Sequence, residues 1–148
     1  MSSTDPSRPT GWTRLLHLGG DAWLGLAGGA LSVGDENGPR REVDPANPTG
    51  LLPCLERPHD VVLLELRDRE VELSMAPGSL SALVPLRAIP RAAVSSQIDY
   101  WVELALDWIE GMPPAEVDTD LLELLEHESW PTQRVRHRAG RLRRRGSM

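Results

Sequence analysis

Short apolar runs alternate with glycine pairs near the start of the chain. WTRLLHL, AWLGL and ALSV are separated by GGD and AGG, so a turn signal recurs about every nine residues. Glycine pairs supply the positive φ angles that two-residue hairpin loops require. The pattern predicts three short antiparallel strands, beginning at Trp12, that form a β-meander. One irregular glycine-rich loop is the alternative.

A long polar stretch follows, from Gly34 to Pro58, and it contains five prolines. Prolines at this density exclude a continuous helix and predict an exposed loop. Long loops in compact domains are often functional or mobile. The stretch is therefore the first candidate for a partner site, and a plain connection is the alternative.

The segment Asp60–Met75 alternates apolar and polar residues. Val62, Leu64 and Leu66 share one face at period two, and the residues at 71, 73 and 75 continue the alternation. This periodicity predicts a sheet element. The Arg67–Glu70 segment turns the chain into a hairpin in one interpretation, whereas the other is a single long, bent strand.

The segment Ser95–Met112 has apolar residues at spacings of three and four, which predicts an amphipathic helix near 96–111. Ser96 is the expected N-cap, and Gly111 followed by two prolines ends the helix. Its opposite face carries an acidic ridge: Asp99, Glu103, Asp107 and Glu110. A solvated surface, a site for a basic partner and a surface that receives the last helix are all open interpretations of this ridge.

Two further helices are predicted near 118–128 and 131–144. The first buries four leucines, at 121, 122, 124 and 125, after an Asp or Thr cap. On the second, Val135, Ala139 and Leu142 fall within one narrow stripe of the helical wheel. Arginines flank both sides of this stripe, as expected for a helix that docks through an apolar seam covered by arginine stems.

These elements predict an α+β fold in which an N-terminal antiparallel β-meander sheet is packed by C-terminal helices. Residues 1–10 are predicted to be a disordered lead-in. Residues 11–148 are expected to form a single α+β domain, with the sheet part over 12–75 and the helical part over 95–145. A chain of 148 residues is long enough to bury a core without metal or disulfide help.

Charge is divided unevenly along the chain. Residues 1–130 hold all 22 acids and nine arginines, a formal charge of −13, whereas residues 131–148 carry seven arginines and no acid. A cationic helix tethered to an anionic body finds its counter-charge locally, which favours intramolecular docking. Contact with nucleic acid or with an acidic protein is the alternative. The residues concerned are Arg134, Arg136, Arg138, Arg141, Arg143, Arg144 and Arg145.

Composition excludes several chemistries. The sequence contains no lysine, which rules out P-loop, Schiff-base and protein-kinase motifs. A single cysteine, Cys54, allows neither an intramolecular disulfide nor a cysteine-rich zinc site. We expect no cofactor and no metal. The preference for arginine over lysine is typical of GC-rich genomes such as those of actinobacteria.

No pattern of residues predicts catalysis. His59 and Asp60 near Cys54 are the one grouping with a possible nucleophile and base, and an ordinary loop histidine beside a small buried cysteine is the favoured interpretation. Among the tryptophans, Trp101 and Trp108 belong to the helical stripe. Trp12, Trp23 and Trp130 are unassigned, and an exposed tryptophan is a common interface anchor.

The run AWLGLAGGALSVGDENGP resembles the hydrophobic strand ending in G-D-E-x-x-P of some bacterial immunity proteins. These are small cytosolic inhibitors of polymorphic toxins, so the resemblance implies a non-enzymatic toxin binder. The residues that carry it are Gly29, Ala30, Leu31, Gly34, Asp35 and Glu36.

We therefore expect a small, non-enzymatic, cytoplasmic protein-interaction protein, with a nucleic-acid-associated accessory protein as the alternative. The sequence has neither a secretory signal pattern nor a long apolar span, so no membrane association is expected. The predicted partner-binding residues are Trp23, Asp35, Glu36, Asp99, Glu103, Asp107 and Glu110.

Overall fold

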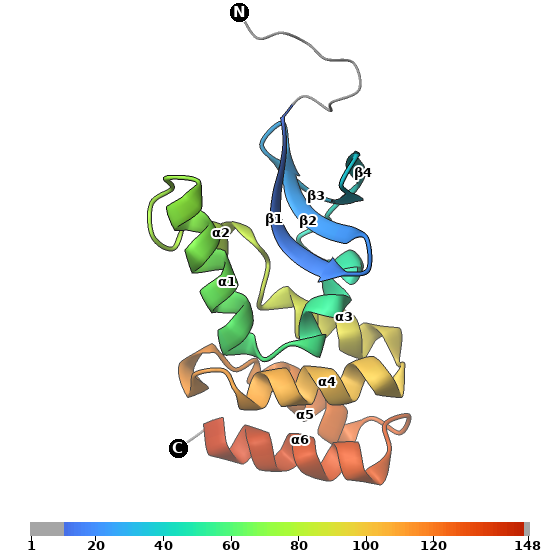
Figure 1. Cartoon of the computed structure of the whole chain (residues 1–148). Coiled ribbons are helices and arrows are strands. Elements are labelled where there is room, and N and C mark those ends of the chain that lie inside the picture. Colours follow the sequence, from blue (N-terminus) through green and yellow to red (C-terminus); the bar gives the residue numbers. More distant parts are fainter. Residues whose placement is uncertain (1–10, 147–148) are drawn as a thin grey trace, which may run out of the picture.

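The computed structural model of the protein describes residues 11–146. A four-stranded antiparallel sheet begins at Trp12, and helices follow it along the chain (Figure 1). The predicted disordered lead-in, residues 1–10, lies outside the described residues. The strands are β1 (Trp12–Gly19), β2 (Ala22–Ala27), β3 (Ala30–Asp35) and β4 (Gly38–Glu42), and their spatial order is their chain order. The predicted α+β fold with an N-terminal β-meander is confirmed.

A bulge in β1 explains why two neighbouring leucines are both buried. The pairing with β2 shifts register between Arg14 and Leu16, and again between His17 and Gly19. An extra residue in one strand breaks the strict alternation of faces. Leu15 and Leu16 consequently both point into the core, and Leu18 follows them.

Trp12 lies across the sheet at a position where β2 has no side chain. A Cβ on Gly25 would meet the Trp12 ring at 2.7 Å, so glycine makes room for the indole. The Trp12 indole N–H donates to the Asp35 carbonyl on β3 at 3.0 Å. Trp12 on β1 therefore packs over β2 and hydrogen-bonds to β3, so it links three strands of the sheet.

The stretch predicted as an exposed loop, 34–58, contains two regular elements. Gly38–Glu42 is the edge strand β4, where Pro39 is tolerated because edge strands need fewer N–H donors. Thr49–Glu56 forms the 3₁₀ helix η1, which contains Pro53 and buries Leu51, Leu52 and Leu55. The prediction of a wholly exposed loop is wrong, because η1 packs into the core.

The predicted sheet element over 60–75 is also wrong. The chain forms the helix α1 (His59–Glu72), so the sheet ends at Glu42 rather than Met75. Val62, Leu66 and Glu70 are buried at spacings of four, which is the helical repeat. Fourteen residues without glycine or proline suit a helix better than a strand.

Short helices connect α1 to the helical end of the molecule. Glu70 near the end of α1 accepts hydrogen bonds from the backbone N–H groups of Gly78 (2.9 Å) and Leu80 (2.7 Å). Both N–H groups lie at the N-terminus of the helix α2 (Ser79–Leu83). The first N–H groups of a helix have no acceptor within the helix, so they need one from elsewhere. Glu70 therefore caps α2 from a neighbouring helix.

The helix predicted near 96–111 is confirmed as α4 (Asp99–Glu110), although it starts later than predicted and a separate helix precedes it. The preceding helix, α3 (Ala88–Ser96), ends at Gln97, which has a left-handed backbone with φ of 55°. Helix α4 begins after Ile98. Ser96 is not the N-cap of α4: its hydroxyl donates to the Ala93 carbonyl and accepts from the Ile98 N–H, so it closes α3. Ile98 is consequently exposed rather than part of the apolar stripe.

The last two helices lie close to their predicted positions. A short 3₁₀ turn, η2 (Pro114–Glu116), leads to α5 (Thr119–His127), where the Asp118 side chain accepts from the Leu121 N–H as the N-cap. Leu124, predicted to be buried, is exposed. Helix α6 (Gln133–Gly146) starts two residues later than predicted, and the Thr132 hydroxyl accepts from the Val135 N–H.

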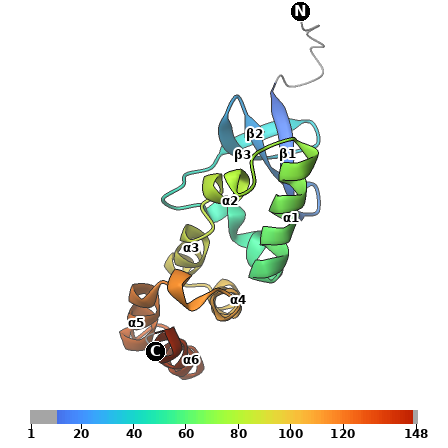
Figure 2. The ribbon, with the colours of Figure 1, turned by 90° about the vertical axis from the view of Figure 1, so that its left-hand side faces the viewer.

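Two apolar clusters make the core, and α4 contributes to both. Ala105 and Trp108 pack with the sheet, η1 and α1–α3. Val102, Leu106 and Ile109 pack with α5 and α6. Helices α5 and α6 therefore lie at the end of the molecule furthest from the sheet (Figures 1 and 2). No helix among residues 11–146 is long and apolar enough to cross a membrane.

Candidate functional site

The seam predicted on the last helix is buried. Val135, Ala139 and Leu142 expose 2%, 0% and 7% of their surface and pack in the cluster shared by α4 and α5. The prediction that the arginine-rich segment folds against its own domain is confirmed. Docking by apolar area matters more here than charge, because exposed ion pairs contribute little individually.

One flank of α6 covers the acidic ridge of α4. The Arg138 guanidinium donates to Asp107 Oδ1 at 2.5 Å and to Glu110 Oε2 at 2.8 Å. Burial alone would lower the pKa of Arg138, but these two hydrogen bonds and the negative charges of Asp107 and Glu110 together raise that pKa. Arg134 lies 3.4 Å from Glu103, and Arg145 donates to the Glu110 carbonyl at 2.9 Å.

The other flank of α6 pairs with α5. Arg143 donates to Glu126 at 2.7 Å, and this hydrogen bond lowers the pKa of the Glu126 carboxyl. A Cβ at position 140 would lie 2.9 Å from Glu126 Oε1, so Gly140 gives this carboxylate room. The glycine that weakens a helix interior therefore permits close packing here.

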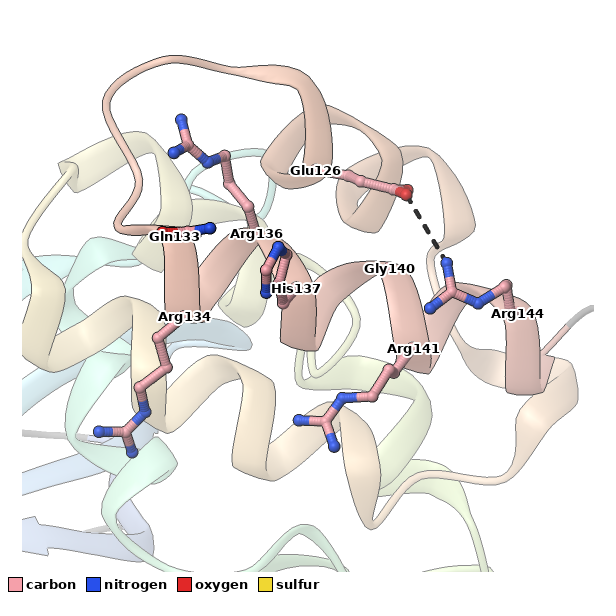
Figure 3. A pocket seen from close by; sticks show the side chains of 8 residues that line it. All are labelled: Glu126, Gln133, Arg134, Arg136, His137, Gly140, Arg141 and Arg144. Carbon is pink, nitrogen blue, oxygen red and sulfur yellow. Dashed lines mark ion pairs between the residues drawn. The ribbon is translucent and has the colours of Figure 1, made fainter.

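The outer face of α6 is left to solvent. Figure 3 shows Arg134, His137 and Arg141 projecting from it beside an open hollow of about 690 Å³, which we call the arginine hollow. Arg144 reaches Glu126 at 3.9 Å. Within residues 11–146, Arg141 forms no ion pair. Four of the seven arginines, at 134, 138, 143 and 144, pair with carboxylates of α4 or α5.

The other predicted partner residues are scattered rather than brought together. Asp35 accepts from the Asn37 N–H at 2.8 Å and from Arg40 at 3.0 Å, and the Arg40 hydrogen bond lowers its pKa. Its carboxylate thus serves the β3–β4 turn. Glu36 is exposed in that turn, and Asp99 is exposed at the start of α4.

Trp23 lies half-exposed at the surface of the sheet. The Arg14 guanidinium lies 4.9 Å from the centre of the Trp23 indole. The centre of the His17 ring also lies 4.9 Å from the centre of the Trp23 ring. A cation over an indole face is a stabilising contact. These residues line a hollow of about 430 Å³ between β1 and α1, which we call the sheet cleft.

Carboxylates from α1 form the opposite wall of the sheet cleft. Glu65, Asp68 and Glu72 line it, together with Arg57 and Arg69. Arg57 pairs with Glu65 at 2.7 Å and Arg69 with Glu72 at 2.8 Å, and Arg69 also donates to the Arg14 carbonyl. The cleft therefore joins an aromatic, cationic sheet edge to an acidic helix face.

Next to this wall, α1 exposes apolar side chains. Val61, Leu64 and Val71 are 38%, 58% and 80% exposed, and we call them the α1 stripe. Asp68 follows Leu64 by four residues, so the stripe and the acidic wall are neighbours on the helix surface. The sequence analysis missed this surface because it predicted a sheet element for the segment. A helical interpretation of the segment would have predicted this surface. If Val62 and Leu66 face the core, the three residues of the α1 stripe lie on the solvent side of the helix.

Cys54 and His59 do not form a catalytic pair. Cys54 is fully buried, which raises the pKa of its thiol to about 12. The His59 ring packs edge-on against Trp108 at 4.9 Å, and burial lowers its pKa. Among residues 11–146, no three histidine, cysteine, aspartate or glutamate side chains gather in a way that would hold a metal ion.

Comparison with known proteins adds no relative to this picture. No protein-family model, no curated protein and no solved structure matches the chain.

Proposed function

We propose that this chain is a non-enzymatic binding protein whose protein partner docks on the α1 stripe and the adjoining sheet cleft. The observation that carries the proposal is the outward apolar face of α1, on which Leu64 and Val71 are more than half exposed. Apolar patches with polar rims mark interaction sites on soluble proteins. Trp23 at the neighbouring cleft supplies an aromatic anchor of the kind enriched in interfaces.

The partner presents a basic, amphipathic surface. Helix α1 carries five acids and two arginines, and the acids include Asp60, Asp68 and Glu72 on its solvent side. Complementary charge steers association and suppresses wrong partners. The acidic ridge of α4 is a weaker candidate for the same role, because α6 already neutralises much of it.

The finer part of the proposal is that the partner is a toxin and the chain an immunity-type inhibitor acting in the cytoplasm. The resemblance of the β3 segment to bacterial immunity proteins supports the toxin assignment. The single cysteine supports a reducing compartment.

Capture from the native host tests the proposal. Wild-type protein should retain a basic partner, Leu64→Glu or Val71→Glu should lose it, and Leu124→Glu should keep it, because Leu124 is an exposed leucine on α5, at the opposite end of the molecule. Equal retention by all variants would refute the α1 surface. Turnover of a substrate that disappears on substitution of His59 or Cys54 would refute the non-enzymatic assignment.

A second candidate is a nucleic-acid-associated accessory protein. It is favoured by the outer face of α6, where Arg134, His137 and Arg141 are exposed and line the arginine hollow (Figure 3). Arginine contacts to phosphate give a salt-dependent affinity. Fluorescence anisotropy with labelled DNA and RNA should then show binding at low salt that Arg141→Gln weakens and Arg41→Gln does not. Undetectable binding at low salt would eliminate this candidate.

A further inference from the structure

A third cleft lies between α1, α2 and the loop that follows α4. Its volume is about 540 Å³, within the range of small-molecule sites. Its walls are mainly apolar, and they come from Leu63, Val84, Pro85, Leu86, Ala88 and Met112. We call it the histidine cleft, because His59 lines it. Its lining residues differ from those of the α1 stripe and the sheet cleft.

The His59 ring opens onto this cleft. His59 is 4% exposed, and its ring nitrogens form no hydrogen bond within the described part of the chain. Every fully buried side-chain nitrogen or oxygen among residues 11–146 has a hydrogen-bond partner. Because the His59 ring nitrogens have no such partner, they are not fully buried, and they retain access to the cleft. A nearly buried imidazole without a partner leaves a hydrogen-bonding position for a ligand.

Two exposed arginines line the same cleft. They are Arg67 on α1 and Arg87 before α3, and neither forms an ion pair among residues 11–146. Glu116 of η2 is the acid among the lining residues. The lining therefore carries a net positive charge when His59 is neutral. Ser81 also lines the cleft, but its hydroxyl donates to the Gly78 carbonyl at 3.1 Å, so no nucleophile is poised beside His59.

We infer that the histidine cleft binds a small amphipathic carboxylate. The carboxylate lies between the Arg67 and Arg87 guanidinium groups, whose N–H donors match its geometry. The His59 imidazole completes its hydrogen bonds, and the hydrocarbon part packs on Leu63, Leu86 and Met112. Arginine is suited to this role because its charge persists at any physiological pH.

Octanoate is the probe, and NMR titration with calorimetry is the measurement. At neutral pH octanoate should bind saturably and shift the resonances of His59, Leu63 and Met112. Octanol, which has the same hydrocarbon chain and no charge, should bind at least roughly tenfold more weakly, because charge-assisted hydrogen bonds are lost.

Variants with matched charge separate recognition from folding. Arg67→Gln with Arg87→Gln should weaken octanoate binding at least roughly tenfold, whereas Arg41→Gln with Arg141→Gln, which removes the same charge elsewhere, should leave it unchanged. Glu116→Gln should tighten binding, and this variant remains informative if the double substitution fails to fold. The inference is overturned if octanol and octanoate bind equally, if the shifts map away from the histidine cleft, or if no saturable binding occurs.

Discussion

Arg138 and Asp107 are 31 residues apart in the chain, and a hydrogen bond of 2.5 Å joins the guanidinium of one to the carboxylate of the other. The contact links α6 to α4 and places the arginine-rich helix over the acidic ridge. Basic and acidic segments that look like two separate binding surfaces in the sequence are thus largely each other's partners. The surface that we propose for the protein partner lies elsewhere, on α1 and the sheet edge.

Replacing Arg138 tests the electrostatic part of this docking. Arg138→Gln should lower the free energy of unfolding by about 1 kcal/mol at low salt, because it removes contacts to both Asp107 and Glu110. The loss should shrink at high salt, since salt screens partly exposed pairs. Arg141→Gln, at an exposed arginine without an ion pair, is the control and should be nearly neutral. Urea unfolding at two salt concentrations measures both.

Replacing Leu142 tests the apolar part. Leu142→Ala should cost about 2–3 kcal/mol, because Leu142 is buried in the seam between α6 and its neighbours. The loss should be the same at low and high salt. Leu124→Ala, on the exposed side of α5, should cost much less. If Leu142→Ala were as mild as the control, α6 would not be docked through the seam.

The β-meander and the C-terminal helices could be predicted because several local signals agree there. Glycine pairs mark the turns on either side of β2, and Val135, Ala139 and Leu142 share a stripe that no solvent-exposed helix would need. The α1 segment was wrongly predicted as a sheet element because two patterns compete in it. Val62, Leu64 and Leu66 fit the period of two of a strand, whereas Val62, Leu66 and Glu70 fit the helical repeat. Tertiary packing decides between these patterns, and it is not visible in one sequence.

Other features had no local signal at all. Gln97 ends α3 in a left-handed conformation that glycine usually supplies, so the break before α4 could not be anticipated. The α1 stripe was missed for the same reason as α1, since Leu64 and Val71 become exposed only once the segment is a helix. The histidine cleft is lined by residues from four segments, and nothing in their sequence spacing predicts that they lie close together.

Glu70 should make the stability of the protein depend on acid pH. Hydrogen bonds from the backbone N–H groups of Gly78 and Leu80 lower the pKa of its carboxyl below the unfolded value. Its contribution is present above the unfolded pKa, about 4.3 for glutamate, and is lost as pH falls through the folded pKa. Glu70→Gln should therefore be destabilised at neutral pH and approach wild type in acid. Urea midpoints across this range, with Glu72→Gln as the exposed control, measure the difference.

His59 should add a second pH dependence at higher pH. Burial lowers its folded pKa, although the nearby Glu116 and Asp60 charges oppose the shift and Arg67 and Arg87 line the same cleft. The unfolded state then binds more protons below about pH 6.5, so stability falls as pH drops through that value. Thermal melts from pH 7.5 to 5.5 should show this slope for wild type and for His127→Gln, whose histidine is exposed. The slope should be reduced in His59→Gln, and an unchanged slope there would contradict the assignment.

Amide hydrogen exchange of the protein, measured alone and with its captured partner, shows whether the partner docks on α1 and the sheet cleft. We expect new protection on the solvent side of α1, around Leu64, and at β1 beside Trp23, with no change on the outer face of α6. Protection confined to α6, or to the β3–β4 turn, with α1 unchanged, would contradict docking on α1.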